Sequence, residues 1–213
     1  MSVSQLPVAQ VTQMVLHVCH GMEGSKDLLT QADKAIGDGD HGVGMARGFE
    51  AVRQKVSSQP FASVGDVFKA VGMALLTSVG GASGAIFGTL FRGGASRLGD
   101  RQALDAASLA ILLSDGLRAV QERGKAKPGD KTMVDALGPA SQMAQELTTI
   151  DLDEALSQVT EAARLGMEST KNMVAALGKS QSLGERSLGH PDPGAVSTYL
   201  MLKFMAEYVH QIA

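Results

Sequence analysis

Three aspartates lie within a span of eight residues near the start of the chain: Asp33, Asp38 and Asp40. Neighbouring carboxylates repel one another, and a bound cation is the simplest way to hold several of them together. Carboxylate oxygens favour hard ions such as magnesium, manganese or calcium. We therefore predict a metal site in this stretch. The alternative is a solvated turn in which the aspartates cap a helix.

Two known loop templates can be compared with this stretch by counting. A calcium EF-hand loop that began at Asp38 would need glycine at its sixth position and glutamate at its twelfth, but the chain has Val43 and Phe49 there. The glycines of residues 37–42 match a G-x-G-x-x-G pattern, yet no predicted strand precedes them and two aspartates would face the pyrophosphate. Both templates fail. What remains is a carboxylate site for magnesium, the ion that bridges protein and phosphates in phosphoryl-transfer enzymes.

Three further stretches are rich in glycine or proline. Residues 78–84 precede an apolar run, as in a phosphate cradle at a helix N-terminus, although close helix packing through Gly80, Gly84 and Gly88, at four-residue spacing, is the alternative. Residues 124–132 look like a Walker A loop, but Asp130 interrupts the motif and no strand precedes it. This stretch is either a basic loop near a nucleotide or an ordinary turn in which Asp130 caps the next helix. Residues 184–194 suit a rigid wall against a base or ribose, or a plain surface loop.

Helical periodicity dominates the segments between these stretches. Apolar residues recur at steps of four, three and four over residues 44–56, which is the pattern of an amphipathic helix. Similar stripes occupy residues 64–75 and 152–163, and a further helix is predicted over residues 196–207, after a proline and a glycine that suit a helix start. No segment shows the alternation of a strand. The predicted apolar stripes consist of Met45, Phe49, Val52, Val56, Val64, Val67, Phe68, Val71, Leu75, Leu152, Ala155, Leu156, Val159 and Ala163.

These helices predict an all-α fold, a bundle of about eight helices judged from the spacing of the loops. When short connections join the helices of a bundle, successive helices alternate in direction, so every second loop lies at the same end. The stretches 36–44, 78–84, 123–132 and 184–194 would then meet at one mouth. We predict that the ligand site lies there.

The bulk composition fits one domain over residues 1–213, because the length is near the usual domain size and no linker-like shift in composition divides the chain. A net charge of −3 with dispersed basic residues argues against a nucleic-acid partner. The chain has no long uncharged apolar run and no apolar signal core, and its single cysteine, Cys19, cannot form an internal disulfide. We therefore expect a cytoplasmic protein with no membrane partner.

Taken together, the four stretches resemble the L subunit of bacterial dihydroxyacetone kinases, in that family's order and approximate spacing. The matching strings are Ile-Gly-Asp-Gly-Asp-His-Gly at 36–42, Ser-Val-Gly-Gly-Ala-Ser-Gly at 78–84, Arg-Gly-Lys-Ala-Lys-Pro-Gly-Asp-Lys-Thr-Met at 123–133 and Leu-Gly-Glu-Arg-Ser-Leu-Gly-His-Pro-Asp-Pro-Gly at 183–194. The similarity covers nearly the whole chain, residues 11–208. It implies an antiparallel barrel of eight helices, with ADP or ATP at the open end and two magnesium ions between the phosphates and the aspartates.

The resemblance also assigns site residues. It matches Asp33, Asp38 and Asp40 to the metal ligands. It implies nucleotide contacts at His41, Gly44, Ala82, Ser83, Gly124, Met133, Asp192, Pro193 and Gly194. Two positions depart from the best-known members, because Gly44 stands in place of an asparagine and Lys179 in place of an arginine. Lysine keeps the charge but loses the planar two-pronged guanidinium, which leaves open the phosphate or base contact made there.

The chain carries no nucleophile and base of the acyl-transfer type, and the resemblance explains this, because the family binds its ketose through a histidine on a separate K subunit. It implies a kinase subunit that supplies magnesium and nucleotide and acts only with that partner. Either bound ADP is rephosphorylated by a protein of the sugar phosphotransferase system, or ATP exchanges freely. The ketose stays open between dihydroxyacetone and one such as erythrulose. The alternative function is a nucleotide-sensing module that regulates a partner without kinase activity.

Overall fold

The computed structural model describes residues 2–213, and helices make up nearly all of its regular structure. Among these residues there are nine α-helices: α1 (Val8–Gly24), α2 (Lys26–Ile36), α3 (His41–Ser57), α4 (Val64–Ser78), α5 (Gly81–Ala95), α6 (Ala106–Gly124), α7 (Val134–Glu146), α8 (Leu152–Ser169) and α9 (Pro193–Ile212). Two short 3-10 helices, η1 (Thr170–Asn172) and η2 (Lys179–Ser187), lie between α8 and α9. The predicted all-α fold class is confirmed.

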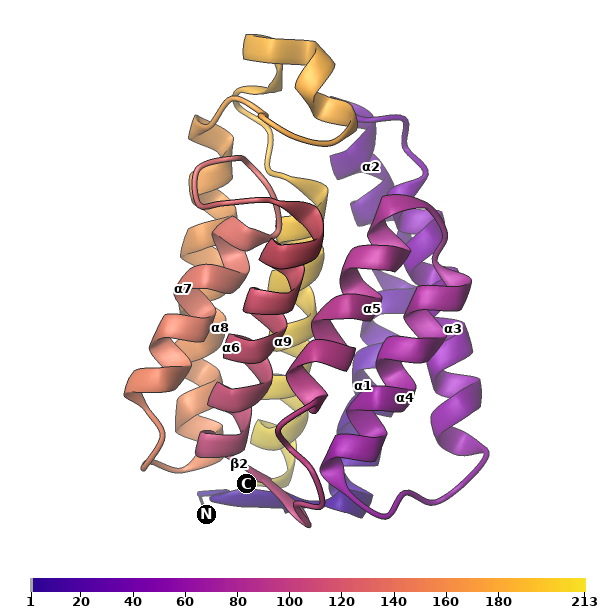
Figure 1. Cartoon of the computed structure of the whole chain (residues 1–213), viewed down its shortest axis with the longest axis vertical. Helices are drawn as coiled ribbons and strands as arrows, with labels where there is room; N and C mark the ends of the chain where they lie inside the picture. The colour runs from indigo at the N-terminus through magenta and orange to yellow at the C-terminus, as the bar shows by residue number, and fades with distance from the viewer. Residues whose placement is uncertain (1) are drawn as a thin grey trace.

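All the α-helices except α2 form a closed ring of eight. In order of contact, α1 packs against α3, the helices α4 to α9 follow in sequence, and α9 packs against α1 (Figure 1). The remaining helix, α2, lies at one end of the ring against α3, α9 and η2. The predicted number of about eight helices therefore describes the barrel itself, and α2 is an addition at its mouth.

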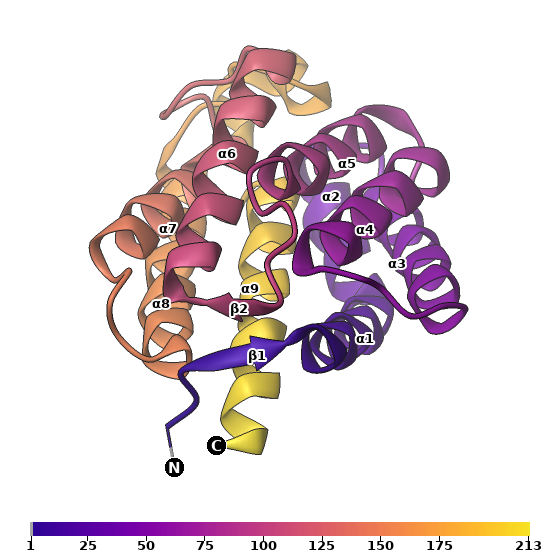
Figure 2. The same cartoon turned by 60° about the horizontal axis from the view of Figure 1, so that its bottom comes forward.

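A small antiparallel pair of strands lies at the opposite end of the barrel. β1 (Gln5–Pro7) pairs with β2 (Ala103–Asp105), so that Leu6 lies opposite Leu104, and both leucines are fully buried. The pair crosses the end where the two chain termini also lie (Figure 2). These strands were not predicted, because three residues per strand are too few to show the alternation by which strands are recognised.

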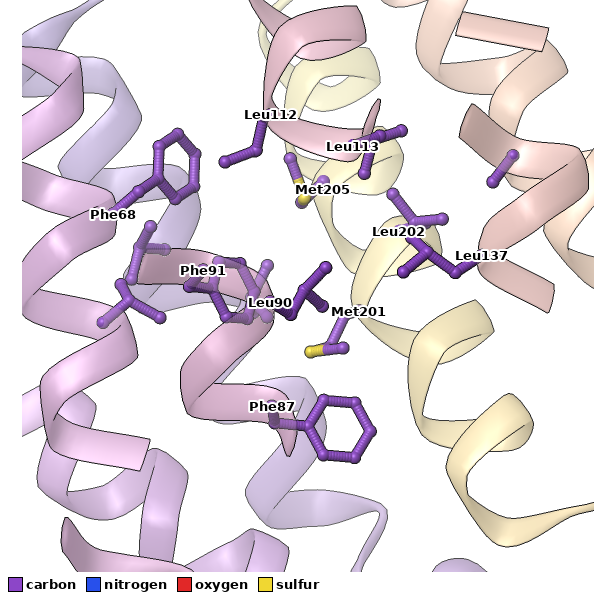
Figure 3. Packing of buried hydrophobic residues seen from close by; sticks show 14 of the residues in the cluster. Phe68, Phe87, Leu90, Phe91, Leu112, Leu113, Leu137, Met201, Leu202 and Met205 are labelled. Carbon is purple, nitrogen blue, oxygen red and sulfur yellow. The ribbon is translucent and has the colours of Figure 1, made fainter. Parts of the chain in front are cut away.

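Apolar side chains fill the interior of the ring. All the residues of the stripes predicted over 44–56, 64–75 and 152–163 are buried. Side chains from α4, α5, α6, α7 and α9 converge inside the barrel (Figure 3). Among them the rings of Phe68 and Phe91 stack with centroids 6.1 Å apart, while Met201 and Met205 approach from α9. The chain has no tryptophan, and leucine, valine, alanine, methionine and phenylalanine supply most of the buried packing.

Glycines allow α4 and α5 to lie very close together. A Cβ atom added at Gly88 would lie 2.7 Å from the Cβ of Leu76 and 2.9 Å from the carbonyl oxygen of Gly72. Real Cβ atoms do not approach other atoms so closely, so both helices would have to move apart. The packing interpretation of the glycine-rich run is therefore confirmed for its C-terminal part.

The loops are shorter than predicted. α3 begins at His41, and only residues 79–80 separate α4 from α5. η2 takes up the start of the stretch 184–194, and α9 begins at Pro193 with the carboxylate of Asp192 as its cap. Of the helices in residues 2–213, none combines the length and apolar character that crossing a bilayer requires.

Candidate functional site

A cavity of about 670 Å³ opens at the end of the barrel where α2 meets α3, α4 meets α5, α6 meets α7 and α8 leads to α9 (Figure 1). All four predicted stretches contribute to its wall, which confirms that they meet at one mouth. The predicted site residues that line it are Asp33, Asp38, Asp40, His41, Gly44, Ala82, Ser83, Met133, Lys179, Asp192, Pro193 and Gly194. Gly124 does not line the cavity: it ends α6 behind Ile86, with an added Cβ 3.2 Å from the Cδ1 of that isoleucine.

The three predicted metal ligands come together on one side of the cavity. Asp33 is buried on the last turn of α2, whereas Asp38 and Asp40 are exposed in the link to α3. One carboxylate oxygen from each lies within 4.8 Å of the others. Gly37 leaves room for this arrangement, because a Cβ there would lie 2.2 Å from Oδ1 of Asp33. Three acidic oxygens in this arrangement fit a hard divalent cation such as magnesium. Within the described part of the chain, no other such group of three occurs.

Lys179 supplies positive charge to this acidic cluster. Its ammonium, on the first residue of η2, donates hydrogen bonds to the carboxylate of Asp38 and to Oδ2 of Asp40, the second over 3.1 Å. The bond to Lys179 holds the pKa of Asp38 below its usual value, and the same contact raises the pKa of Lys179. The residue that departs from the family's arginine therefore lies directly on the predicted metal ligands.

His41 connects three walls of the cavity. Its backbone N–H donates to Oδ2 of Asp33 over 3.1 Å. Its ring nitrogens lie 3.1 Å from Oγ of Ser83 and 2.8 Å from Oγ of Ser197, on α5 and α9. Burial lowers the pKa of the imidazole below its usual 6.5, so the ring is neutral near pH 7. Ser197 is fully buried and was not predicted as a site residue.

Three helices begin at the cavity wall. These are α3, α5 and α9, and residues of the first turn of each line the cavity. A helix N-terminus presents free backbone N–H groups and partial positive charge, which together favour phosphate. At the start of α5 no side chain caps these groups, and the chain enters the helix through Gly80 at a φ of 83°. Such a left-handed backbone favours glycine.

Arg47, on α3, bonds to the segment that connects α4 to α5. It was not predicted as a site residue. Its Nε donates to the carbonyl of Ser78 and its Nη2 to the carbonyl of Val79, each over 2.6 Å. These carbonyls lie at the C-terminus of α4, where the last carbonyls have no hydrogen-bond partner within the helix. Gly44 faces the same place, because a Cβ there would lie 3.0 Å from the carbonyl oxygen of Val79. Glycine at this position therefore lets α3 approach the loop closely.

The α6–α7 loop is fixed by two aspartates. Oδ1 of Asp135 accepts from the N–H of Gly129 over 2.6 Å, and its Oδ2 accepts from the N–H of Thr132 over 2.8 Å. Asp130 instead bonds back to the N–H of Lys127 over 2.9 Å. The suggestion that Asp130 caps the next helix is therefore wrong, since its carboxylate is used within the loop. Lys131 is buried at the centre of this loop.

The start of α9 forms the wall of the cavity that faces the α6–α7 loop. Oδ2 of Asp192 accepts from the N–H of Ala195 over 2.8 Å and so caps the helix. Burial raises the pKa of the Asp192 carboxyl to about 7, while the N–H of Ala195 and the charge of Lys131 act to lower it. An added Cβ at Gly194 would lie 3.4 Å from the Cβ of Met133, so this wall packs directly on the α6–α7 loop. The cavity thus places a carboxylate cluster beside several helix N-termini, which suits a phosphate-bearing ligand held together with a cation.

Comparison with known proteins points in the same direction. A family model described as "DAK2 domain" matches residues 35–207. The chain is 42% identical over 185 residues to the "PEP-dependent dihydroxyacetone kinase, ADP-binding subunit DhaL" of Escherichia coli K12, covering 84% of this chain and 87% of that protein. It is 38% identical over 186 residues to the "PEP-dependent dihydroxyacetone kinase 1, ADP-binding subunit DhaL" of Listeria innocua, covering 87% of this chain and 89% of the relative.

A solved structure shares the fold. The crystal structure of the dihydroxyacetone kinase from C. freundii in complex with AMP-PNP and Mg2+ matches with a TM-score of 0.73 at 25% identity. The match covers 95% of this chain and 34% of the other, so the chain spans about a third of that longer protein.

Proposed function

Since the chain belongs to the DAK2 domain family, we propose that it is the nucleotide-binding subunit of a dihydroxyacetone-type kinase, acting as one domain over residues 1–213. In this role it supplies ADP or ATP with magnesium to a ketose that is bound on a separate K-type subunit. The relatives from E. coli and Listeria innocua are both named as ADP-binding subunits of such kinases, and this chain covers most of their length.

One observation in the structure carries the proposal. The acidic cluster of Asp33, Asp38 and Asp40 lies in the same cavity as the first turns of α5 and α9. Carboxylates alone would repel a nucleotide's phosphates, and helix N-termini alone would bind any anion. A ligand that satisfies both is a phosphate chain with a bound divalent cation, as in phosphoryl-transfer enzymes generally.

We assign the metal ions to the cluster. Asp33, Asp38 and Asp40 would hold two magnesium ions, which neutralise the charge that develops on the phosphates during transfer. Lys179 would then leave its contacts with Asp38 and Asp40 and be free to face a phosphate. A lysine there would act as a point charge, without the two-pronged contact that an arginine makes.

We assign nucleotide contacts to the remaining wall of the cavity: His41, Gly44, Ala82, Ser83, Met133, Asp192, Pro193 and Gly194. His41 is neutral and bonded through both ring nitrogens, so it would position the loops and not exchange protons with the substrate. The uncapped N–H groups that begin α5 would bind phosphate oxygens, and the capped start of α9 would form part of the surrounding wall. Gly124 would support this surface through Ile86 and not by direct contact.

Catalysis would require the partner. The chain contributes positioning and charge, which is most of what phosphoryl transfer asks of a protein, and no residue of the cavity is assigned as a catalytic base. In-line transfer needs the acceptor hydroxyl close to the terminal phosphorus, and a cavity open to solvent offers only water until a partner covers it. The names of the two relatives, which include "PEP-dependent", support rephosphorylation of bound ADP by a phosphotransferase-system protein over free exchange of ATP.

A coupled assay tests the proposal. The purified chain is given magnesium, dihydroxyacetone or erythrulose, and either ATP or a phosphotransferase-system donor, first alone and then with a K-type subunit. We expect ketose phosphorylation only when both subunits are present. Robust phosphorylation by the chain alone would refute the division of labour. Tight nucleotide binding without activity in any combination would favour a nucleotide-sensing module.

A further inference from the structure

Lys131 is an unusual residue for the wall of a ligand cavity. It belongs to the cavity lining, yet only 1% of its surface is exposed to solvent. Its backbone is left-handed, with a φ of 60°, a conformation that side chains other than glycine, asparagine and aspartate rarely adopt. Backbone strain of this kind persists only where the surrounding contacts enforce it, and such places gather at functional sites.

The ammonium of Lys131 points into the protein and joins segments that are distant in sequence. It donates to the carbonyl of Thr170 over 2.5 Å and to the carbonyl of His190 over 2.6 Å. The hydroxyl of Thr170 in turn accepts from the N–H of Asp192 over 2.9 Å. One side chain of the α6–α7 loop thus holds both the end of α8 and the turn that precedes α9.

The electrostatic surroundings are arranged for a buried cation. Burial lowers the pKa of Lys131, while the carboxylates of Asp192 and Asp135 act in the opposite direction. Burying a cation with two backbone acceptors and two acidic neighbours costs desolvation free energy, and removal of one of these groups leaves the others without a partner. Two members of this cluster, Lys131 and Asp192, line the cavity itself.

We propose that Lys131 is a positioning residue for the nucleotide, which holds residues 192–194 at the start of α9 against Thr132 and Met133 of the facing wall. The proposal rests on the nucleotide-binding role set out above. Lys131 does not touch the nucleotide through its ammonium, because both short bonds of that group lead away to backbone carbonyls. It acts through the position of residues 192–194, which its bonds to Thr170 and His190 fix.

Calorimetric titration with ADP in magnesium buffer is the first test. The variants are Lys131→Met, which keeps the length of the side chain without its charge, and Lys131→Gly, which also relieves the left-handed backbone. We expect both to bind ADP at least tenfold more weakly than the wild type. The control is Val159→Ala on α8, which removes buried volume outside the cavity and should bind ADP within twofold of the wild type.

A second measurement separates positioning from general loss of stability. In the Lys131 variants, hydrogen exchange should accelerate at least tenfold in peptides that span residues 189–196 and stay unchanged in peptides from the start of α3. In steady-state assays with a K-type partner, the KM for nucleotide should rise while the KM for ketose stays constant. Lys131→Gly serves for all measurements if Lys131→Met does not accumulate as folded protein.

The outcomes are distinguishable. If the wild type itself binds no ADP with magnesium, the proposed function is wrong. If the wild type binds and the Lys131 variants bind with the same affinity, the positioning role is wrong. The role is equally refuted if ADP binding weakens in Val159→Ala as much as in the Lys131 variants, or if exchange accelerates uniformly over the barrel.

Discussion

The substitution Asp192→Asn should change how the stability of the protein depends on pH. The carboxylate of Asp192 caps α9, and burial raises its pKa from the usual 3.8 to about 7. Asparagine keeps an oxygen that can accept the same hydrogen bond from Ala195 and ranks with aspartate as a helix cap. The substitution therefore removes an ionisation from the cavity wall with little change in shape.

The sign and size of the effect follow from the two pKa values. The folded protein binds the proton of the Asp192 carboxyl more tightly than the unfolded chain does. The contribution of this proton to the free energy of unfolding is therefore complete below pH 3.8 and is lost as pH rises to about 7. The interval between 3.8 and about 7 corresponds to on the order of 4 kcal/mol. This is an upper value, because Asp192 lines the cavity and stays partly exposed.

Urea unfolding from about pH 5 to about pH 8, in EDTA and without nucleotide, measures the part of this contribution that is lost above pH 5, at most about 3 kcal/mol, as the difference between wild type and variant. The free energy of unfolding of the wild type should fall relative to that of Asp192→Asn as pH rises. Asp105→Asn is the matched control, because Asp105 caps α6 through Ser108 over the same 2.8 Å. Burial of Asp105 is outweighed by its hydrogen bonds and by Arg101, so its pKa is lowered and its difference curve should be flat. Parallel curves for wild type and Asp192→Asn would show that the Asp192 carboxyl is not perturbed.

Four further outcomes are expected. Asp38→Asn should weaken ADP binding at least tenfold in magnesium buffer, and unchanged calorimetric affinity would remove the metal assignment. A hundredfold excess of ADP with magnesium over its Kd should raise Tm by about 5–10 °C, and EDTA should abolish most of this rise if metal bridges the nucleotide. Cys19, buried and with its thiol pKa raised to about 12 mainly by burial, should react with a thiol reagent at pH 8 only after unfolding. Gly42→Ala should destabilise by about 1–3 kcal/mol in urea, because its Cβ would lie 2.2 Å from the carbonyl oxygen of Lys26, whereas Gly24→Ala in α1, with nothing within 4 Å, should not destabilise.

Periodicity in the sequence was sufficient to predict the fold class and four of the helices, α3, α4, α8 and α9. Apolar stripes at helical spacing predicted the buried faces of α3, α4 and α8, because a helix repeats every 3.6 residues whatever lies beyond it. Stretches rich in glycine and proline located the loops. Because successive helices of a bundle alternate in direction, these loops were predicted to lie at one end. Periodicity could not show that α2 lies outside the ring, since its stripe is short and two of its neighbours, η2 and α9, are distant in sequence.

The acidic cluster was also local enough to be predicted. Asp33, Asp38 and Asp40 lie close together because a short link with glycines folds them onto one another. The residue types alone predict a cation site, since neighbouring carboxylates repel one another. The place of Lys179 in the site came from the family resemblance, and its contact with Asp38 and Asp40 emerged only in the structure.

The residues that hold the site together were decided by tertiary structure. Ser197 meets His41 across 156 positions of the chain, and Lys131 reaches His190 across 59. Arg47 and Lys131 bond to backbone carbonyls, which every residue carries, so no residue type at the other end marks the contact. The sequence by itself determined the helices α3, α4, α8 and α9, the approximate positions of the loops and the acidic cluster, because each of these depends on neighbours along the chain. The arrangement of the cavity walls depends on which helix ends meet in space, and only the folded barrel brings them together.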